Sequence, residues 1–403
     1  MMKAQTRSSL FWVSIILLLV PALVYAYLLM PFPGSQNINA ITLCYYLAKI
    51  VFPLRVLGAA LTIFYLFKYF RNNTKKGKIA KVTVLAFCLV SFYFTDVMSK
   101  AEVMFEEPKT IRFANAIHNR VPEDLVVIGL VNNGVAKAYP LLYLGYHHKI
   151  QDNVGDEPVL VTYCTMCRAG RVYSPVINGV RQNFRLVGAQ HYNAVIEDEG
   201  TKTWWYQATG KAAVGKLKGS VLQELPYEQS TLESWLNRHP GSLILQPDQY
   251  YMTDYHDLRD YDRIQAVDRD STIKDKDKLI RKSWVLAIIV NGQAKAYDWR
   301  QLDKKRVLND SLSKVPLLIA LEDDSLSFHV FDRNMKGMTL HFKVNDDGAV
   351  IDRETSSGWN WDGLAISGPL VGNRLTKIQA YQEYWHSWKH FHPNTLFWNK
   401  GDD

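Results

Sequence analysis

The stretch VLVTYCTMCRAG, residues 159–170, organises the soluble part of this 403-residue chain. Its first five residues favour a β-strand and lead directly to Cys164 and Cys167. We expect a strand, a turn that carries both cysteines, and a second strand. Two cysteines at C-x-x-C spacing can close a small disulfide ring or bind one metal ion together. The two other cysteines lie in strongly apolar segments, so we expect the chemistry of this protein at Cys164 and Cys167.

Three apolar segments near the start of the chain predict transmembrane helices over about residues 10–30, 50–70 and 79–98. The first segment is longer than the apolar core of a secretory signal, and further membrane sequence follows it, so we interpret it as an uncleaved helix. Lys49 and Arg55 interrupt the second apolar region, and their long side chains are expected to extend to the membrane interface.

The distribution of charge predicts the topology. Residues 1–9 and 71–78 are basic, whereas the loop 31–40 carries no charge. Because basic segments remain in the cytoplasm, we expect a cytoplasmic N-terminus, three crossings and an exoplasmic soluble region. Asp96, near the outer end of the third span, is expected at the interface. The cysteine pair is then expected in an oxidising exoplasmic compartment.

Charge and composition also limit the partners. The net charge of +8 includes the basic loop of the membrane anchor. No basic patch with interleaved aromatic residues is evident, so we expect no nucleic-acid partner. The expected partners are the lipid bilayer and either another exoplasmic thiol protein or a small thiol.

The soluble region contains two similar halves. VVIGLVNNGVAKAYPLLYL, residues 126–144, resembles VLAIIVNGQAKAYDWRQL, residues 285–302. Asp198, Thr201 and Trp205 likewise match a second set of the same residue types, which are Asp352, Thr355 and Trp359. Repeats of this kind indicate a duplicated structural element.

The fold class that we expect is an N-terminal three-helix transmembrane anchor followed by a β-rich α+β region of two duplicated lobes. The transmembrane region is residues 1–100. The first lobe, with the C-x-x-C motif, is residues 101–247. A charged linker, residues 248–283, leads to a degenerate second lobe, residues 284–400.

The repeat provides an internal comparison for the cysteines. Cys164 aligns with Glu322 and Cys167 with Ser325, so the thiols occur in the first lobe alone. His147 aligns with a lysine in the same way. The polar replacements in the second lobe predict that these positions are exposed or partly polar.

Three kinds of function remain open for the cysteine pair. In a thiol/disulfide redox protein, Cys164 attacks and Cys167 resolves, with Arg168 and His147 as local modulators and no cofactor. In a metal-binding module, Cys164, Cys167 and His147 bind copper or zinc. In a ligand-binding or assembly protein without enzymatic activity, a permanent disulfide stabilises the turn.

Several motifs resemble one bacterial family, the domain of unknown function 3179. The motifs are G-x-A-K-A-Y-P-L (134–141), D-N-V-G-x-x-P (152–158), T-Y-C-x-x-C (162–167), D-x-x-T-x-T-x-W-x-Q (198–207) and G-x-L-x-G (215–219). The resemblance extends over about residues 121–247 and implies membrane attachment or export. Together with the predicted topology, it implies the bacterial inner membrane, with the soluble region on the periplasmic or extracellular side. Some members of the family carry selenocysteine in the C-x-x-C region, which implies redox chemistry.

The resemblance also implies functional positions. It assigns the cysteines to Cys164 and Cys167 and the histidine before the D-N pair to His147. It further marks an acidic-Thr-Trp-Gln segment, which we expect to bind substrate through Asp198, Thr201, Trp205 and Gln207. The redox function is the one that we expect, and the sequence does not indicate its substrate.

Overall fold

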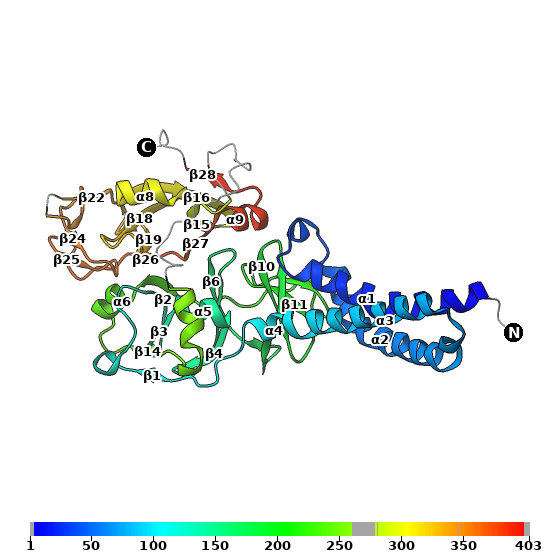
Figure 1. Cartoon of the computed structure of the whole chain (residues 1–403). Helices are drawn as coiled ribbons and strands as arrows, with labels where there is room; N and C mark the ends of the chain where they lie inside the picture. Colours follow the sequence, from blue (N-terminus) through cyan, green and yellow to red (C-terminus); the bar gives the residue numbers. More distant parts are fainter. Residues whose placement is uncertain (1–3, 260–278, 280, 346, 399–403) are drawn as a thin grey trace. The chain divides into compact units, whose positions relative to one another are not determined.

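The computed structural model describes residues 4–259, 279, 281–345 and 347–398 (Figure 1). Much of the predicted linker, residues 260–278 and 280, lies outside the described residues. The chain divides into two compact units. The first unit contains residues 1–106, 182–206 and 210–221, and the second contains the remainder.

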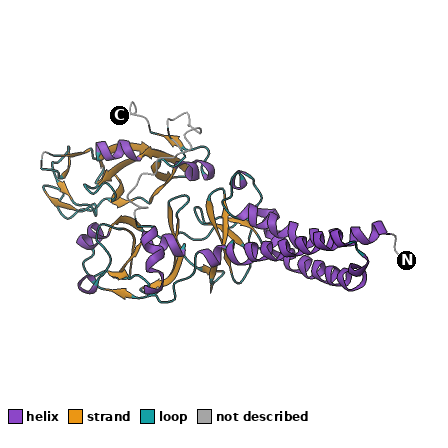
Figure 2. Ribbon diagram, viewed as in Figure 1, coloured by secondary structure: helices purple, strands orange, loops and turns teal. Residues whose placement is uncertain are grey.

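Three long helices form the start of the first unit, as predicted, and Figure 2 shows them as a bundle. They are α1 (Ala4–Leu29), α2 (Ile41–Tyr69) and α3 (Lys75–Tyr93). The segments Ser8–Leu29, Ile41–Asn72 and Lys75–Met98 are long and apolar enough to cross a membrane. The prediction of three long apolar helices is therefore confirmed, although the second segment begins at Ile41, earlier than the predicted residue 50, and the helices indicate a membrane anchor.

A glycine brings the first two helices together. A Cβ atom at Gly58 of α2 would lie 2.9 Å from the carbonyl oxygen of Ser14 in α1. Small residues at such a position allow the backbones of membrane helices to approach closely. Beside this contact, the Thr62 hydroxyl donates a hydrogen bond of 2.9 Å to Ser14 Oγ.

Two charged residues of the helices form an ion pair that the sequence did not indicate. Arg55 contacts the carboxylate of Asp96, and its Nη2 donates to Thr95 Oγ1 at 2.8 Å. Its Nε donates to the Leu18 carbonyl oxygen at 3.3 Å. Arg55 and Asp96 were each expected to extend separately to the interface. They also pair with each other, because an ion pair between helices satisfies both charges at once, and their position at the interface stays a prediction.

A four-stranded antiparallel sheet completes the first unit. Its order is β12-β11-β10-β9. The strands are β9 (Phe184–Gln190), β10 (Asn193–Asp198), β11 (Trp204–Tyr206) and β12 (Ala212–Val214), and the short helix α4 is Ala101–Met104. The apolar face of the sheet packs against the ends of α1 and α2, where the Trp204 ring lies 5.4 Å from the Tyr45 ring.

The first lobe continues in the second unit and begins with the predicted hairpin. Strands β2 (Val126–Asn132) and β3 (Val135–Pro140) meet at Asn133 and Gly134, which both have positive φ angles, 47° and 77°. Two left-handed residues are typical of the two-residue turn that matches strand twist. The sheet has the order β1-β14-β3-β2-β13.

The remaining elements of this lobe complete that sheet or lie around it. They are β1 (Phe113–Ala114), α5 (Leu141–His147), β4 (Lys149–Val154), β5 (Glu157–Cys164), β6 (Ala169–Tyr173), β7 (Val176–Ile177), β8 (Val180–Arg181), β13 (Glu228–Thr231), α6 (Leu232–Arg238), β14 (Leu243–Leu245) and α7 (Met252–Asp257). Strands β4, β5 and β6 form a three-stranded antiparallel sheet, and its β5–β6 hairpin carries the cysteines.

The second lobe repeats this order of elements. Its hairpin, helix and meander are β15 (Trp284–Val290), β16 (Gln293–Asp298), α8 (Trp299–Lys305), β17 (Val307–Leu312), β18 (Val315–Leu321) and β19 (Phe328–Asp332). Its later elements are β20 (Asn334–Met335), β21 (Met338–Thr339), β22 (Phe342–Val344), β23 (Val350–Asp352), β24 (Gly358–Trp359), β25 (Ala365–Ser367), β26 (Thr376–Lys377), β27 (Ala380–Tyr384), α9 (Trp385–Phe391) and β28 (Leu396–Phe397). The β-rich prediction is confirmed.

Equivalent polar contacts support the interpretation of a duplication. In the first lobe, Asp152 accepts hydrogen bonds of 2.7 Å from both Lys137 Nζ and the Tyr139 hydroxyl. The second lobe has the same contacts, at 2.6 and 2.7 Å, between Asp310, Lys295 and Tyr297. Within the second unit, one apolar core contains side chains from both lobes. The lobes are therefore packed as a single body there.

Candidate functional site

The two predicted cysteines lie at one hairpin turn. Cys164 ends β5 and pairs with Ala169 at the start of β6, so residues 165–168 form the turn. The Cys167 Sγ lies 3.7 Å from the Cys164 carbonyl oxygen. Arg168 adopts a left-handed conformation with φ of 54°, which returns the chain to the second strand. The predicted order of strand, cysteine-bearing turn and strand is confirmed.

Both cysteines are thiols in this structure and have no exposed surface. This contradicts the exposure that we inferred from the polar residues of the second lobe. Glu322, the counterpart of Cys164, is itself only 9% exposed. Its carboxylate lies 2.6 Å from His329 Nε2 and accepts a hydrogen bond of 2.6 Å from Ser234 Oγ. A polar residue can be buried when such partners satisfy it, so its polarity did not indicate exposure.

The second lobe contributes directly to the surroundings of the cysteines. The Arg168 guanidinium carbon lies 3.7 Å from the centre of the Trp284 ring, and Arg168 Nε donates to Gln382 Oε1 at 3.2 Å. The backbone N–H of Tyr384 donates to the Cys167 carbonyl oxygen at 2.9 Å. Arg168 is completely buried, so a cation–π contact replaces part of its hydration.

A pair of glutamines lies beside Arg168. Gln229 Nε2 donates to Gln382 Oε1 at 2.8 Å. The two glutamines occupy equivalent positions, because they pair with Ile128 and Leu286, which correspond in the repeat. Gln382 Nε2 is buried and has no hydrogen-bond partner among the residues that the structure describes. The two equivalent glutamines therefore meet where the lobes are in contact.

A buried ion pair joins the cysteine hairpin to β27. Arg171 of β6 contacts the Glu383 carboxylate, and the two side chains are 3% and 1% exposed. Arg171 also donates to the carbonyl oxygens of Ala208, at 2.9 Å, and Gly170, at 2.6 Å. Burial disfavours the charged guanidinium, but Glu383, Tyr227 and Glu224 together outweigh burial and hold the Arg171 pKa well above its ordinary value. Arg171 is therefore a fixed positive charge in this part of the molecule.

The predicted histidine modulator lies in an aromatic cluster. His147 is the last residue of α5, and its Nε2 is 2.6 Å from the Tyr255 hydroxyl. Its ring is 5.0 Å from the Tyr251 ring. The next residue, His148, is fully buried, and burial lowers its pKa to about 4. His148 is therefore neutral at pH 7.

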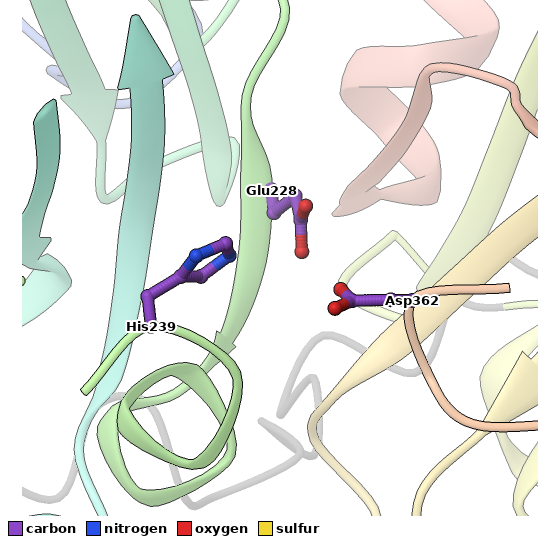
Figure 3. Close-up of side chains that lie close together, drawn as sticks. All are labelled: Glu228, His239 and Asp362. Atoms are coloured by element: carbon purple, nitrogen blue, oxygen red, sulfur yellow. The ribbon is translucent and has the colours of Figure 1, made fainter. Parts of the chain in front are cut away.

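The structure does not assemble the ligand set of the metal-binding hypothesis. Within the described residues, one group of three metal-ligating side chains lies within 4.8 Å, and it consists of Glu228, His239 and Asp362 (Figure 3). Cys164, Cys167 and His147 form no such group there. A copper or zinc site at Cys164, Cys167 and His147 therefore stays a prediction.

The group in Figure 3 is itself better described as an ion-pair cluster. Arg238 and Lys377 both contact the Glu228 carboxylate, and they lie 3.6 and 3.9 Å from Asp362. Burial raises the pKa of Glu228, but these two cations outweigh burial and lower it to about 2. Because two cations already balance the carboxylates, a metal ion is disfavoured.

The predicted substrate-binding residues fall in different units. In the first unit, Asp198 accepts hydrogen bonds from the Thr201 N–H at 2.6 Å, the Thr201 hydroxyl at 2.7 Å and Trp205 Nε1 at 2.9 Å. The second lobe repeats the tryptophan contact at 2.9 Å between Trp359 and Asp352. These bonds close a local turn, and a role in substrate binding stays a prediction.

Gln207 lies in the second unit and supports the cysteine hairpin. Its Nε2 donates to Thr162 Oγ1 and to the Ala169 carbonyl oxygen, both at 2.9 Å. The backbone carbonyl oxygen of Gln207 accepts a hydrogen bond of 2.8 Å from the Tyr173 hydroxyl. The side chain is 1% exposed, and its two hydrogen bonds connect β5 to β6. The prediction that it binds substrate is not tested by these contacts.

The anchor, the β-rich lobes and the buried cysteine turn together define a class of membrane-anchored protein with a C-x-x-C hairpin. The chain matches the family model described as "Protein of unknown function (DUF3179)" over residues 106–395, and it belongs to that family. The match covers both lobes, whereas the resemblance seen in the motifs ended near residue 247. No curated protein and no solved structure matches the chain.

Proposed function

We propose that this protein is a thiol/disulfide redox protein in which Cys164 and Cys167 alternate between dithiol and disulfide. The observation that carries the proposal is the position of both cysteines at one hairpin turn, with Cys167 Sγ only 3.7 Å from the Cys164 carbonyl oxygen. Two cysteines at C-x-x-C spacing in one turn lie close enough in the chain to form a small disulfide ring.

The proposed reaction takes place in two exchange steps. The Cys164 thiolate attacks a substrate disulfide, which forms a mixed disulfide and releases one substrate thiolate. The Cys167 thiolate then attacks the Cys164 sulfur and releases the second substrate thiolate. Two electrons pass from the cysteine pair to the substrate, and the pair leaves the cycle as a disulfide. A reductant of the thiol class restores the dithiol.

Arg168 and His147 act in this proposal as positioning residues. Arg168 holds the turn against the second lobe through Trp284 and Gln382. His147 holds the end of α5 through Tyr255. Because both sulfurs are buried, the reactive form requires a local opening of the turn 165–168. Small disulfides need a smaller opening than protein disulfides.

The proposed location is the bacterial inner membrane, with the cysteines on the exoplasmic side. The basic segments 1–9 and 71–78 favour a cytoplasmic N-terminus. With three spans, the soluble region is then exoplasmic, where a disulfide is a stable state of a cysteine pair.

A trapping experiment tests the roles of the two cysteines. The full-length protein is reduced and treated with oxidised glutathione, and the peptide of residues 150–168 is analysed by mass spectrometry. The Cys167→Ser variant should accumulate a glutathione adduct on Cys164, because the resolving thiol is absent. The Cys164→Ser variant should accumulate much less, and the Cys44→Ser control should behave as the wild type. Equal amounts of glutathione adduct on Cys164→Ser and Cys167→Ser would contradict the proposal.

A structural disulfide is the second candidate, and the complete burial of both cysteines favours it. A bond across so short a loop contributes about 2 kcal/mol to stability by restricting the unfolded chain. This candidate predicts that a loss of stability is the only effect of Cys164→Ser or Cys167→Ser. It also predicts that the disulfide resists mild reductants.

A further inference from the structure

The membrane helices enclose a cavity that the redox proposal does not use. It has a volume of about 960 Å³ and lies within the first unit. Its walls come from α1, α2, α3, the segment of residues 95–102 that follows α3, and the start of β9. Most of the lining is aliphatic or aromatic, with Ala22, Val56, Ala59, Leu89 and Phe92 among its residues. Such a lining suits a hydrocarbon chain.

The cavity has a polar end. Arg55, Asp96, Thr95 and Lys100 all line it. Three N–H groups of Arg55 have partners among the described residues, namely Asp96, Thr95 and the Leu18 carbonyl oxygen. A guanidinium carries five N–H groups, so two N–H groups of Arg55 remain for a ligand. Lys100 lies 4.0 Å from Asp96, and its ammonium carries three donors.

This polar end lies near the end of the third apolar segment. The segment that contains α2 extends over 32 residues, whereas about 20 helical residues cross the hydrocarbon core. The ion pair of Arg55 with Asp96 therefore falls near one end of the membrane-spanning part, because Asp96 lies close to the end of the third span at Met98. Lys100 follows just beyond that end.

We propose that this cavity binds one phospholipid of the surrounding membrane, with an acyl chain among the helices and the phosphate at Arg55 and Lys100. Guanidinium and ammonium groups are the usual protein partners of phosphate, and Arg55 offers directed donors while Lys100 offers a mobile charge. Asp96 lowers the net charge at this end. This favours a diester phosphate with a single negative charge over a more highly charged group.

The experiment uses the full-length protein extracted from bacterial membranes in a mild detergent. Bound phospholipid is counted by native mass spectrometry and by phosphorus analysis after solvent extraction. The wild type should retain about one phospholipid per chain. The Ala59→Trp variant fills the cavity and should lose it, whereas Val82→Trp should retain it. Val82 is on α3, is 55% exposed and does not line the cavity.

A second variant tests the polar end without changing the packing. Lys100 is 44% exposed, so Lys100→Glu should fold normally and should lower phospholipid retention about fivefold. The matched control is Lys78→Glu, in the basic loop and outside the cavity lining. A wild type without stoichiometric phospholipid, or equal retention by Ala59→Trp and Val82→Trp, would overturn the proposal.

Discussion

The replacement of Glu383 by glutamine should strongly destabilise the second unit. Glu383 is the buried partner of Arg171, and the two side chains are 1% and 3% exposed. Loss of one partner from a buried ion pair costs about 3–5 kcal/mol, because the other charge remains buried without compensation. Glu224 lies 3.7 Å from Arg171 Nε and keeps part of the compensation. We therefore expect a loss near 3 kcal/mol, at the lower end of that range.

Urea unfolding of the full-length protein in detergent, followed by tryptophan fluorescence, measures this loss. With a slope of about 3 kcal/mol per molar urea, the midpoint should fall by about 1 M. Asp323→Asn is the control, because Asp323 is 98% exposed and lies 3.0 Å from Arg306. Its midpoint should match the wild type. If Glu383→Gln shifts the midpoint no further than this control, the argument from burial is wrong.

Three further predictions concern the same unit. The pKa of Glu228 is lowered to about 2 from its ordinary value of 4.5, so this carboxylate contributes about 3 kcal/mol of stability above pH 4.5, and this stability is lost as the pH falls towards 2. Thermal unfolding measured from pH 6 to pH 2 should show this loss of stability, and Glu228→Gln should reduce the loss. A Cβ atom at Gly129 would lie 2.3 Å from the buried ring of Trp235, so Gly129→Ala should cost about 1–3 kcal/mol in urea unfolding, and an unchanged midpoint would contradict the close contact. Gln207→Leu removes the donor to Thr162 and should cost about 1–3 kcal/mol; if the variant loses activity with no loss of stability, Gln207 contacts substrate instead.

Much of the fold followed from local patterns in the sequence. The three apolar segments, the turn at Asn133 and Gly134, and the strands on either side of the cysteines all appear as expected. These features depend on residues that are close in the chain, such as an apolar run of sufficient length or a left-handed turn. The repeat also predicted the matching order of elements in the second lobe.

The surroundings of the cysteines could not be predicted in this way. Trp284 and Gln382 reach Arg168 from the second lobe, more than a hundred residues away in the chain. Their positions follow from the packing of two lobes, which residue spacing does not encode. The absence of cysteines from the second lobe suggested a passive copy, yet this lobe supplies the side chains that hold the turn.

The contact between Arg55 and Asp96 escaped prediction for a similar reason. Each residue taken alone is expected at the membrane interface, where water satisfies its charge. Their pairing becomes visible only when α2 and the end of the third span are adjacent. The same arrangement creates the polar end of the helix cavity.

The most direct test of the redox proposal is the reduction potential of the Cys164/Cys167 pair. The full-length protein is equilibrated in thiol/disulfide buffers of known potential, and the state of the peptide of residues 150–168 is read by alkylation and mass. The proposal predicts a reversible two-electron couple between about −120 and −270 mV, the range of known exchange proteins. A disulfide that is reduced only below about −300 mV would contradict it and would identify the pair as a structural bond.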